Sequence, residues 1–174
     1  MEQWMEVDPR WENQKGPILD IGCHLWDWSA QFADRRHVIG VDPIEKTCPT
    51  WATLIRAAVS IGPGTIRLSD GGGMDNSVVY GTGGTVVPAV RFQELLLHKP
   101  ALVKMNVEGA EYPLLMSVSH PIADQLIVSF HDTEWLSTSS YSPHATSALL
   151  GYLSNWYTTK CIFHYCKWFQ FLRK

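Results

Sequence analysis

The stretch "ILDIGCHLWDWS", residues 18–29, decides the expected fold because an apolar run ends in an acid and a glycine before an aromatic segment begins. "PILDIG", residues 17–22, predicts a short buried strand, and "WDWSAQFAD", residues 26–34, predicts a helix after it. "HVIGVDP", residues 37–43, then predicts a second strand that also ends in an acid. Alternating strands and helices are typical of a parallel sheet covered on both faces.

The remaining chain continues this alternation with one β-rich interruption. "TWATLIRAAVS", residues 50–60, predicts a segment that starts as a helix and ends as a strand near 57–60. Residues 64–92 contain short β-prone pieces between glycine clusters, which predict turns and hairpins. We expect further helices within 92–99, 110–119 and 142–156, and strands within 101–109, 124–132 and 159–174, the last as a hairpin.

Length and composition fit one domain with a continuous core. The chain has 174 residues, of which 45% are hydrophobic and 18% charged, and its net charge of −3 argues against nucleic acid or anionic membrane as a partner. No stretch approaches the ~20 apolar residues of a membrane span. The four cysteines lack C-x-x-C spacing, which favours reduced thiols and a cytoplasmic protein. We expect an N-terminal arm over 1–16 and a doubly wound α/β domain over 17–174. Its sheet should be mostly parallel, with an antiparallel C-terminal strand. The sequence does not decide between a monomer and a homo-oligomer.

Polar and charged side chains end the predicted core strands. In open α/β sheets, ligands bind outside the carboxyl ends of the strands, where the strand order reverses. The residues at these ends are Asp20, Gly22, Cys23, His24, Asp42, Pro43, Asn106, Glu108, His131 and Asp132. Asp42 follows Gly22 by about 20 residues, the spacing at which a carboxylate binds a ribose in dinucleotide folds. This pair fits NAD as well as other nucleosides, and it also fits a tight turn with a solvated acid.

The run "LVKMNVEGAEYPLL", residues 102–115, helps to distinguish NAD, another nucleoside and a solvated acid as interpretations of Gly22 and Asp42. Lys104 and Asn106 alternate with apolar residues, so they and Glu108 are expected on one side of the strand near its carboxyl end. An edge strand with one solvent-exposed face would show the same alternation of polar and apolar residues.

These segments together resemble the FkbM-type methyltransferases. "KMNVEGAE" is similar to the K-I-D-V-E-G-A-E junction of that family, "ILDIGCHLWDWS" to its glycine loop, "VIGVDP" to its ribose-binding strand and "AAVS" to its third motif. "VVPAVRFQELL" and "LIVSFHD" resemble two later core segments, so the resemblance extends over roughly residues 17–132. The family has a Rossmann-like, class I fold, uses S-adenosylmethionine and mainly methylates hydroxyl groups of sugars, glycans and natural products.

The resemblance implies a role for each matching position. The cofactor, which leaves as S-adenosylhomocysteine, would be held by Asp20, Gly22, Cys23, His24, Trp26, Asp42, Pro43, Ala58 and Val59. The methyl group and the acceptor would face Lys104, Asn106, Glu108, His131 and Asp132. Among these, His131 is the expected general base, because the ordinary pKa of histidine suits that task near neutrality, whereas an amide such as Asn106 cannot take the proton of a hydroxyl. A histidine that only caps or hydrogen-bonds locally at the strand end is the alternative. A metal ion is not expected; its remaining ligands would be Glu108, His131 and Asp132.

Trp26 stands where the family has a glycine, and Asn106 where it has an aspartate. We expect Trp26 to displace the following helix or to turn its ring toward the cofactor pocket, with Trp28 beneath it. Trp135 and Tyr141 follow His131, and they either stack on an acceptor or anchor the loop that contains them. The predicted function is O-methylation of a sugar, glycan or other small-molecule hydroxyl. The alternative is a non-catalytic cofactor- or ligand-binding module of the same fold, while an NAD-dependent oxidoreductase fits Asp42 but not the "KMNVEGAE" run.

Overall fold

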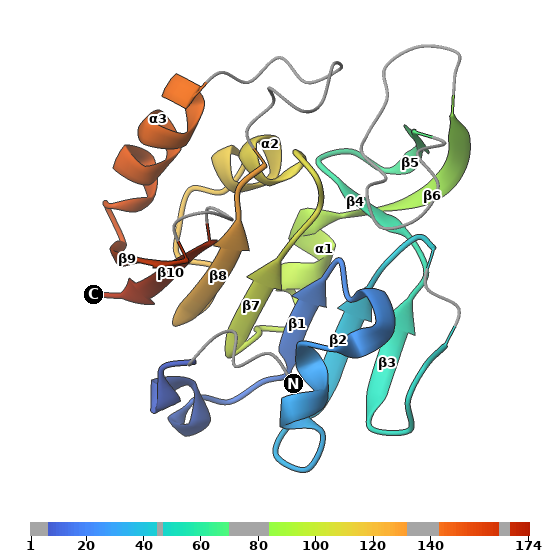
Figure 1. Ribbon diagram of the computed structural model, residues 1–174, viewed down its shortest axis with the longest axis horizontal. Helices are drawn as coiled ribbons and strands as arrows, with labels where there is room; N and C mark the ends of the chain where they lie inside the picture. Colours follow the sequence, from blue (N-terminus) through green and yellow to red (C-terminus); the bar gives the residue numbers. More distant parts are fainter. Residues whose placement is uncertain (1–6, 45–46, 70–83, 132–142, 164–167) are drawn as a thin grey trace.

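The computed structural model describes residues 7–44, 47–69, 84–131, 143–163 and 168–174. Its centre is a seven-stranded sheet with the order β3-β2-β1-β7-β8-β10-β9 (Figure 1). The strands are β1 (Ile18–Ile21), β2 (Val38–Val41), β3 (Ala52–Ile55), β7 (Leu102–Met105), β8 (Gln125–Ser129), β9 (Tyr157–Phe163) and β10 (Trp168–Arg173).

The first five strands in this order run parallel, and β10 is antiparallel to both of its neighbours. The protein is therefore an α/β protein with a mostly parallel, mixed sheet. Because β1, β2, β3, β7 and β8 share one direction, their carboxyl ends meet at one edge, and the turns that follow them are neighbours in space.

A second, three-stranded sheet lies beyond the carboxyl ends of β2 and β3 (Figure 1). It consists of β4 (Ala58–Ser60), β5 (Gly64–Leu68) and β6 (Thr85–Arg91), in the order β4-β6-β5. Ala58, Leu68 and Val87 are buried together in this sheet. The glycine-rich middle of the sequence thus forms paired strands, as expected, and these strands add an apolar wall at the edge where the parallel strands end.

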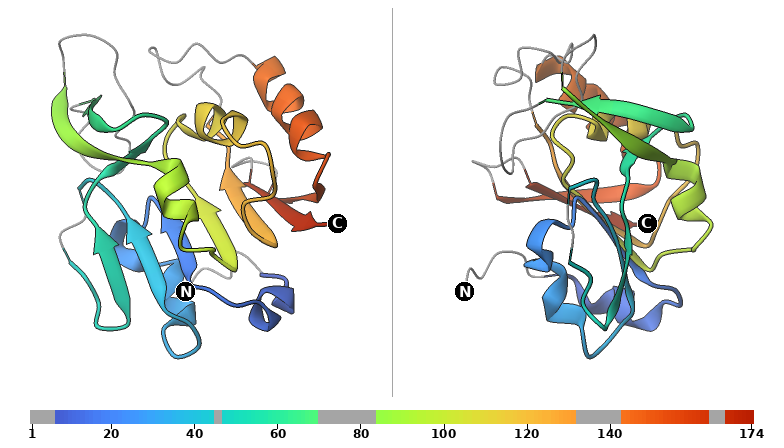
Figure 2. Two further views of the ribbon diagram at one scale, coloured as in Figure 1. Left: turned by 180° about the vertical axis from the view of Figure 1, so that it is seen from behind. Right: turned by 90° about the vertical axis from the view of Figure 1, so that its right-hand side faces the viewer.

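The two faces of the large sheet are covered differently. Three α-helices contribute to the larger core cluster: α1 (Phe92–Leu96), α2 (Glu111–Met116) and α3 (Pro143–Leu153). Three 3-10 helices lie on the other side: η1 (Pro9–Asn13), η2 (His24–Trp26) and η3 (Ser29–Phe32). The edge-on view in Figure 2 shows these N-terminal turns and α1 on opposite sides of the strands.

Aromatic side chains fill the face that has only short helical turns. Trp11 and Trp26 are buried there, with Trp28 and Trp51 packed against the same cluster. The rings of Trp26 and Trp51 meet edge-on with centroids 5.6 Å apart, and Trp28 contacts Phe32 at 4.9 Å. Large aromatic groups bury much area per residue, so they cover this face with little regular structure.

Two expected helices are absent from the places predicted for them. Over 26–34 the chain forms the end of η2 and then η3, and no continuous α-helix begins there, because Leu25 and Trp26 adopt left-handed φ values of 52° and 61°. Residues 52–55, expected to be helical, form β3 and pair with β2 in register. There the pairing with the sheet outweighs the helical pattern of the local sequence.

The other element predictions are confirmed in type. The strand predicted near 57–60 is β4, the helix within 92–99 is α1, and the C-terminal segment pairs as β9 and β10. The expected N-terminal arm includes η1, whose Trp11 is buried in the aromatic cluster. In the part of the chain that the structure describes, no helix is long and apolar enough to cross a membrane. Within the part of the chain that the structure describes, Cys23, Cys48 and Cys161 form no disulfide.

Candidate functional site

A pocket of about 290 Å³ opens where β1, β2 and β7 end. Small-molecule sites typically occupy roughly 300–1,000 Å³, so this one is at the lower end of that range. Strand order reverses beside it, because the chain passes from β1 to β2 on one side and reaches β7 on the other. Its polar lining includes Gly22, His24, Asp42, Asn106 and Glu108, and its apolar lining includes Ala58, Val59, Ile66 and Leu68.

Gly22 lets the turn after β1 pass close to the turn after β7. Its φ is +77°, a value that favours glycine, and a Cβ there would overlap the carbonyl oxygen of Asn106. The Gly22 amide donates a hydrogen bond of 2.8 Å to the carbonyl of Val41. The glycine expected for a tight bend is therefore required by the neighbouring backbone, whatever ligand the pocket holds.

Asp42 lies at the end of β2 and is only 7% exposed. Its Oδ1 accepts a hydrogen bond of 2.8 Å from the amide of Ile44, two residues later. This bond fixes the carboxylate at the pocket wall. A carboxylate has room for further donors, since its two oxygens offer about four lone-pair sites.

Asp20 and Lys104 lie behind the pocket and bind each other. The Lys104 ammonium is 2.9 Å from Asp20 Oδ1, and both side chains are almost fully buried. The ammonium also donates to the carbonyl oxygen of Gly22 at 2.5 Å. This buried pair ties β1 to β7 at the point where the pocket begins, and neither residue is among those that line the pocket. Their observed contacts give them a positioning role for the Gly22 turn.

Glu111, at the start of α2, organises the turn that follows β7. Its side chain is fully buried. One carboxylate oxygen accepts the amide proton of Val107 and the other that of Gly109, each at 2.8 Å. These bonds close the 107–110 turn from within, and the backbone donors stabilise the buried carboxylate.

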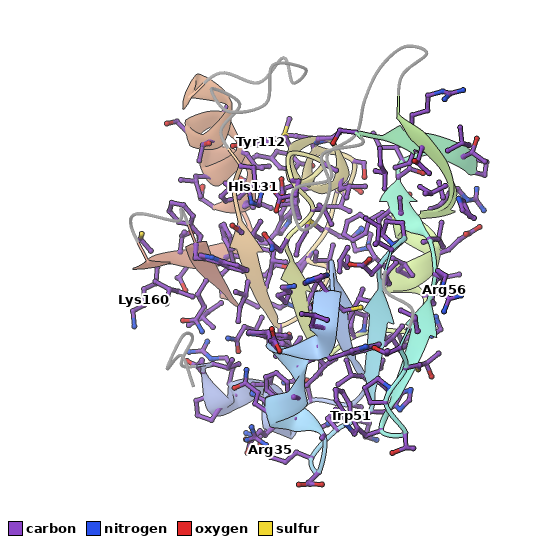
Figure 3. All side chains as sticks on the ribbon, turned by 45° about the vertical axis from the view of Figure 1, so that its right-hand side comes forward. Arg35, Trp51, Arg56, Tyr112, His131 and Lys160 are labelled. Atoms are coloured by element: carbon purple, nitrogen blue, oxygen red, sulfur yellow. The ribbon has the colours of Figure 1, made fainter. Side chains whose placement is uncertain are left out.

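His131, just after β8, meets this turn through both ring nitrogens. Its Nδ1 is 2.9 Å from Glu111 Oε1, and its Nε2 is 3.3 Å from Glu108 Oε1. Figure 3 shows His131 and Tyr112 of α2 in the upper part of the view and Trp51 in the lower part. The ring is therefore held by one buried carboxylate and faces a second, partly exposed one.

Glu108 adopts a left-handed backbone conformation with φ of +51°. Such a conformation costs a residue with a side chain about 1–2 kcal/mol. Glu111 offsets this cost by binding the amides on both sides of Glu108. Glu108 lines the pocket and also contacts His131, so it connects the two parts of the site.

Asn106 lines the pocket beside Gly22. Its Oδ1 atom is buried, and it has no hydrogen-bond partner among the residues that the structure describes. A buried acceptor of this kind costs about 1–3 kcal/mol unless a donor reaches it.

Trp26 lies on the opposite face of the sheet and not in the pocket wall. Its ring and the Cys23 sulfur cover Gly40 of β2 so closely that a Cβ on Gly40 would overlap the ring. The indole nitrogen donates to the carbonyl of Thr47 at 3.0 Å. We expected Trp26 either to displace the following helix or to turn its ring toward the pocket. The ring does not turn toward the pocket, because Gly40 leaves space for it on the back of the sheet, and the helix predicted after it is replaced by 3-10 turns.

The structure brings most of the expected cofactor residues together with two of the residues expected at the acceptor, Asn106 and Glu108. Gly22, His24, Asp42, Pro43, Ala58, Val59, Asn106 and Glu108 line one pocket, with His131 beside it. Asp20, Cys23, Trp26 and Lys104 lie behind it. Asp132, Trp135 and Tyr141 fall outside the described residues.

Glu111 is the functional residue that the sequence analysis missed. In the sequence, Glu111 is visible only as the second glutamate of "EGAE", three residues after Glu108. The structure shows that its carboxylate binds the backbone amides of Val107 and Gly109. Within the described ranges, no group of three His, Cys, Asp or Glu side chains is placed to hold a metal ion. In comparisons with known proteins, no family model, no curated protein and no solved structure matches this chain.

Proposed function

We propose that the protein is an S-adenosylmethionine-dependent methyltransferase that methylates a hydroxyl group of a sugar, glycan or other small molecule in the cytoplasm. The observation that carries this proposal is the position of Glu108, which lines a pocket at the strand ends and contacts the imidazole of His131. A candidate base therefore adjoins a candidate nucleoside pocket.

The order β3-β2-β1-β7-β8 supports a Rossmann-like interpretation of the sheet. It corresponds to the order 3-2-1-4-5 of the doubly wound dinucleotide folds, in which ligands bind beside the first strand. The resemblance of residues 17–132 to the FkbM-type methyltransferases supports the choice of S-adenosylmethionine over NAD.

The pocket residues fit this cofactor in three respects. Asp42 offers a carboxylate to the ribose hydroxyls, and the apolar wall that includes Val59 and Leu68 suits the adenine ring. Asn106, whose amide lines the pocket, suits the ammonium group of the methionine end. The donor and acceptor types thus agree with a nucleoside that also carries a cation.

The cofactor would supply a sulfonium methyl group that bonds to the acceptor oxygen as the carbon–sulfur bond breaks, with the bonding electrons remaining on sulfur. The protein has to hold the acceptor oxygen in line and take its proton. His131 is suited to take that proton at Nε2, because its Nδ1 proton is engaged by the Glu111 carboxylate. A proton on Nδ1 in that bond makes Nε2 the ring nitrogen that can take a proton.

The test is release of S-adenosylhomocysteine from S-adenosylmethionine over a panel of hydroxylated sugars and phenols, followed by mass spectrometry. The wild-type protein should release it with at least one acceptor. His131→Ala should lower kcat by about 100-fold or more, because a positioned base contributes at least that much, with little change in cofactor affinity.

His98→Ala is the matched control, because His98 is exposed at the end of α1 and should leave the rate unchanged. An unchanged rate in His131→Ala would remove this residue from the mechanism. A wild-type protein that binds the cofactor and releases no product over the whole panel would contradict catalysis and favour the binding module.

A further inference from the structure

A second pocket, of about 300 Å³, lies at the opposite edge of the large sheet from the candidate site. Its lining includes Ala101, which precedes β7, Asp124, which precedes β8, and Arg173, which ends the antiparallel β10. These residues meet at the amino ends of β7 and β8, the tails of the two arrows in Figure 1. We propose that this pocket is a second ligand site, which binds a small phosphorylated molecule with at least two negative charges.

Basic side chains from four separate parts of the chain line this pocket: Lys15, Lys99, His120 and Arg173. Asp124 is the acidic residue of the lining, and its carboxylate is engaged by Arg173, whose guanidinium lies 3.2 Å from Asp124 Oδ1. The lining thus has three permanent positive charges against one carboxylate, although the chain as a whole has a net charge of −3. Positive charge is concentrated here against the overall balance of the protein.

Backbone packing brings Lys15 and Lys99 to the same place. A Cβ on Gly16 would overlap the carbonyl oxygen of Lys99, and the amide of Ala101 donates a hydrogen bond of 2.9 Å to the carbonyl of Pro17. Neither lysine side chain has an ion pair or a hydrogen bond with the residues that the structure describes. Like charges that the fold holds near each other repel, and an anion that binds both lysines replaces this repulsion with attraction.

The floor of the pocket is buried and tied in place. Ala101, Ile122 and Ala123 line it and are each at most 8% exposed. The Tyr157 hydroxyl accepts a hydrogen bond of 2.9 Å from the amide of Ile122 and donates one of 3.1 Å to the carbonyl of Ala123. Because hydrogen bonds already hold the backbone beneath the basic side chains, a ligand does not have to order that backbone when it binds.

Charge and size together define the class of ligand. The lining has a net of two positive charges, which a dianion balances and a single carboxylate does not. Lysine binds phosphate as a point charge, and arginine binds it through paired N–H groups. The volume is at the lower end of the range for small-molecule sites, so it suits a phosphorylated small molecule and not a nucleic-acid strand.

The test is a titration of the ¹⁵N-labelled protein with inorganic pyrophosphate, followed by the backbone amide signals. Sodium chloride at about 0.15 M screens charges beyond roughly 8 Å, so the remaining attraction comes from contact with the ion. We expect the amide signals of Lys15, Lys99 and His120 to shift with a Kd below about 1 mM, while those of Gly22 and Asn106 stay in place. Inorganic phosphate, which carries less charge, should bind more weakly.

Three variants separate this pocket from general attraction to the surface. Lys15→Gln and Lys99→Gln should each weaken pyrophosphate binding about fivefold, the upper end of what an exposed ion pair contributes. Lys160→Gln is the matched control, because it removes the same charge from an exposed position on β9 outside the pocket, and it should bind like the wild-type protein (Figure 3). Both pocket lysines are exposed, so their substitution should leave the fold intact.

An equal loss of affinity in all three variants would overturn the proposal, because it would show diffuse attraction to the whole surface. Absence of any shift at about 10 mM pyrophosphate would also overturn it. Shifts confined to Gly22 and Asn106 would do the same, since the anion would then occupy the pocket at the carboxyl ends of the strands. The result is independent of methyl transfer, because the two pockets share no lining residue.

Discussion

The turns after β1 and β7 lie next to each other, and both contain a residue with a side chain in the left-handed region. Trp26 has φ of 61° and Glu108 has φ of 51°. Trp26 is held by packing on the back of the sheet, over Gly40 and against Trp51. Glu108 is held by hydrogen bonds from the turn to the carboxylate of Glu111, and its side chain lines the pocket.

This comparison separates two uses of an unfavourable backbone conformation. At Trp26 the conformation directs a large ring into the core, so its cost is offset by buried apolar area. At Glu108 it directs a charge toward a pocket and a histidine, so its cost is offset by bonds that keep a site in place. Substitutions in the turn after β1 should therefore change mainly the free energy of unfolding, and substitutions in the turn after β7 should change mainly the rate of turnover.

The largest effect is expected at Trp26. Trp26→Gly should lower the free energy of unfolding by about 2–4 kcal/mol, because loss of a buried aromatic ring outweighs relief of the backbone strain. Chemical denaturation measures this change, and the affinity for S-adenosylhomocysteine should stay the same.

Trp26→Ala is the matched control for the backbone contribution. Although alanine usually stabilises a chain relative to glycine, here it should be about 1 kcal/mol less stable, because only glycine accepts φ of 61° freely. A Trp26→Gly protein that keeps its stability and loses cofactor affinity would contradict the comparison and make the ring part of the pocket.

A smaller effect, on chemistry, is expected at Glu111. Glu111→Gln keeps the size of the side chain but presents an NH₂ group to one of the three donors that the carboxylate now accepts. We expect kcat to fall about 10- to 100-fold, which corresponds to about 1.4–2.7 kcal/mol, with KM for the cofactor unchanged.

Hydrogen exchange provides a second measurement for the same variant. The amides of Val107 and Gly109 should exchange faster in Glu111→Gln, while Glu94→Gln should leave both the rate and the exchange unaltered. Unchanged kcat together with faster exchange would restrict Glu111 to a structural role in the turn.

The smallest effect is expected at Glu108, with opposite signs for stability and activity. Glu108→Gly should raise the free energy of unfolding by about 0.5–1 kcal/mol, because glycine removes the left-handed strain at some entropic cost. Turnover should fall at the same time, because the carboxylate beside His131 is lost. Ala110→Gly is the control in the same turn: Ala110 is right-handed, so glycine there should lower stability.

The strands were predictable from the sequence where burial alone defines them. "PILDIG" and "HVIGVDP" became the buried strands β1 and β2 because every residue of those strands is buried between two covered faces. Ala52–Ile55 could not be recognised in the same way, because its residues are only partly buried and its pairing with β2 depends on tertiary context.

Residues of the site could be predicted from the sequence where they end a strand. They could not be predicted where their hydrogen-bond partners depend on the backbone conformation of a turn. Asp42 and Glu108 reach the pocket as expected from their positions after β2 and β7. Lys104, by contrast, was expected to face the methyl acceptor. It lies inside β7, which ends at Met105, and its side chain forms an ion pair with Asp20 behind the pocket. Glu111 became visible only through the amides that it binds.

Calorimetric titration with S-adenosylhomocysteine tests the proposed cofactor pocket most directly. The wild-type protein should bind it in the micromolar range, and Asp42→Ala should bind about tenfold more weakly or worse, since a carboxylate at the pocket wall is lost. Asp34→Ala, at an exposed aspartate, should bind like the wild-type protein. Failure of the wild-type protein to bind either S-adenosylhomocysteine or S-adenosylmethionine at high micromolar concentration would contradict the proposed function.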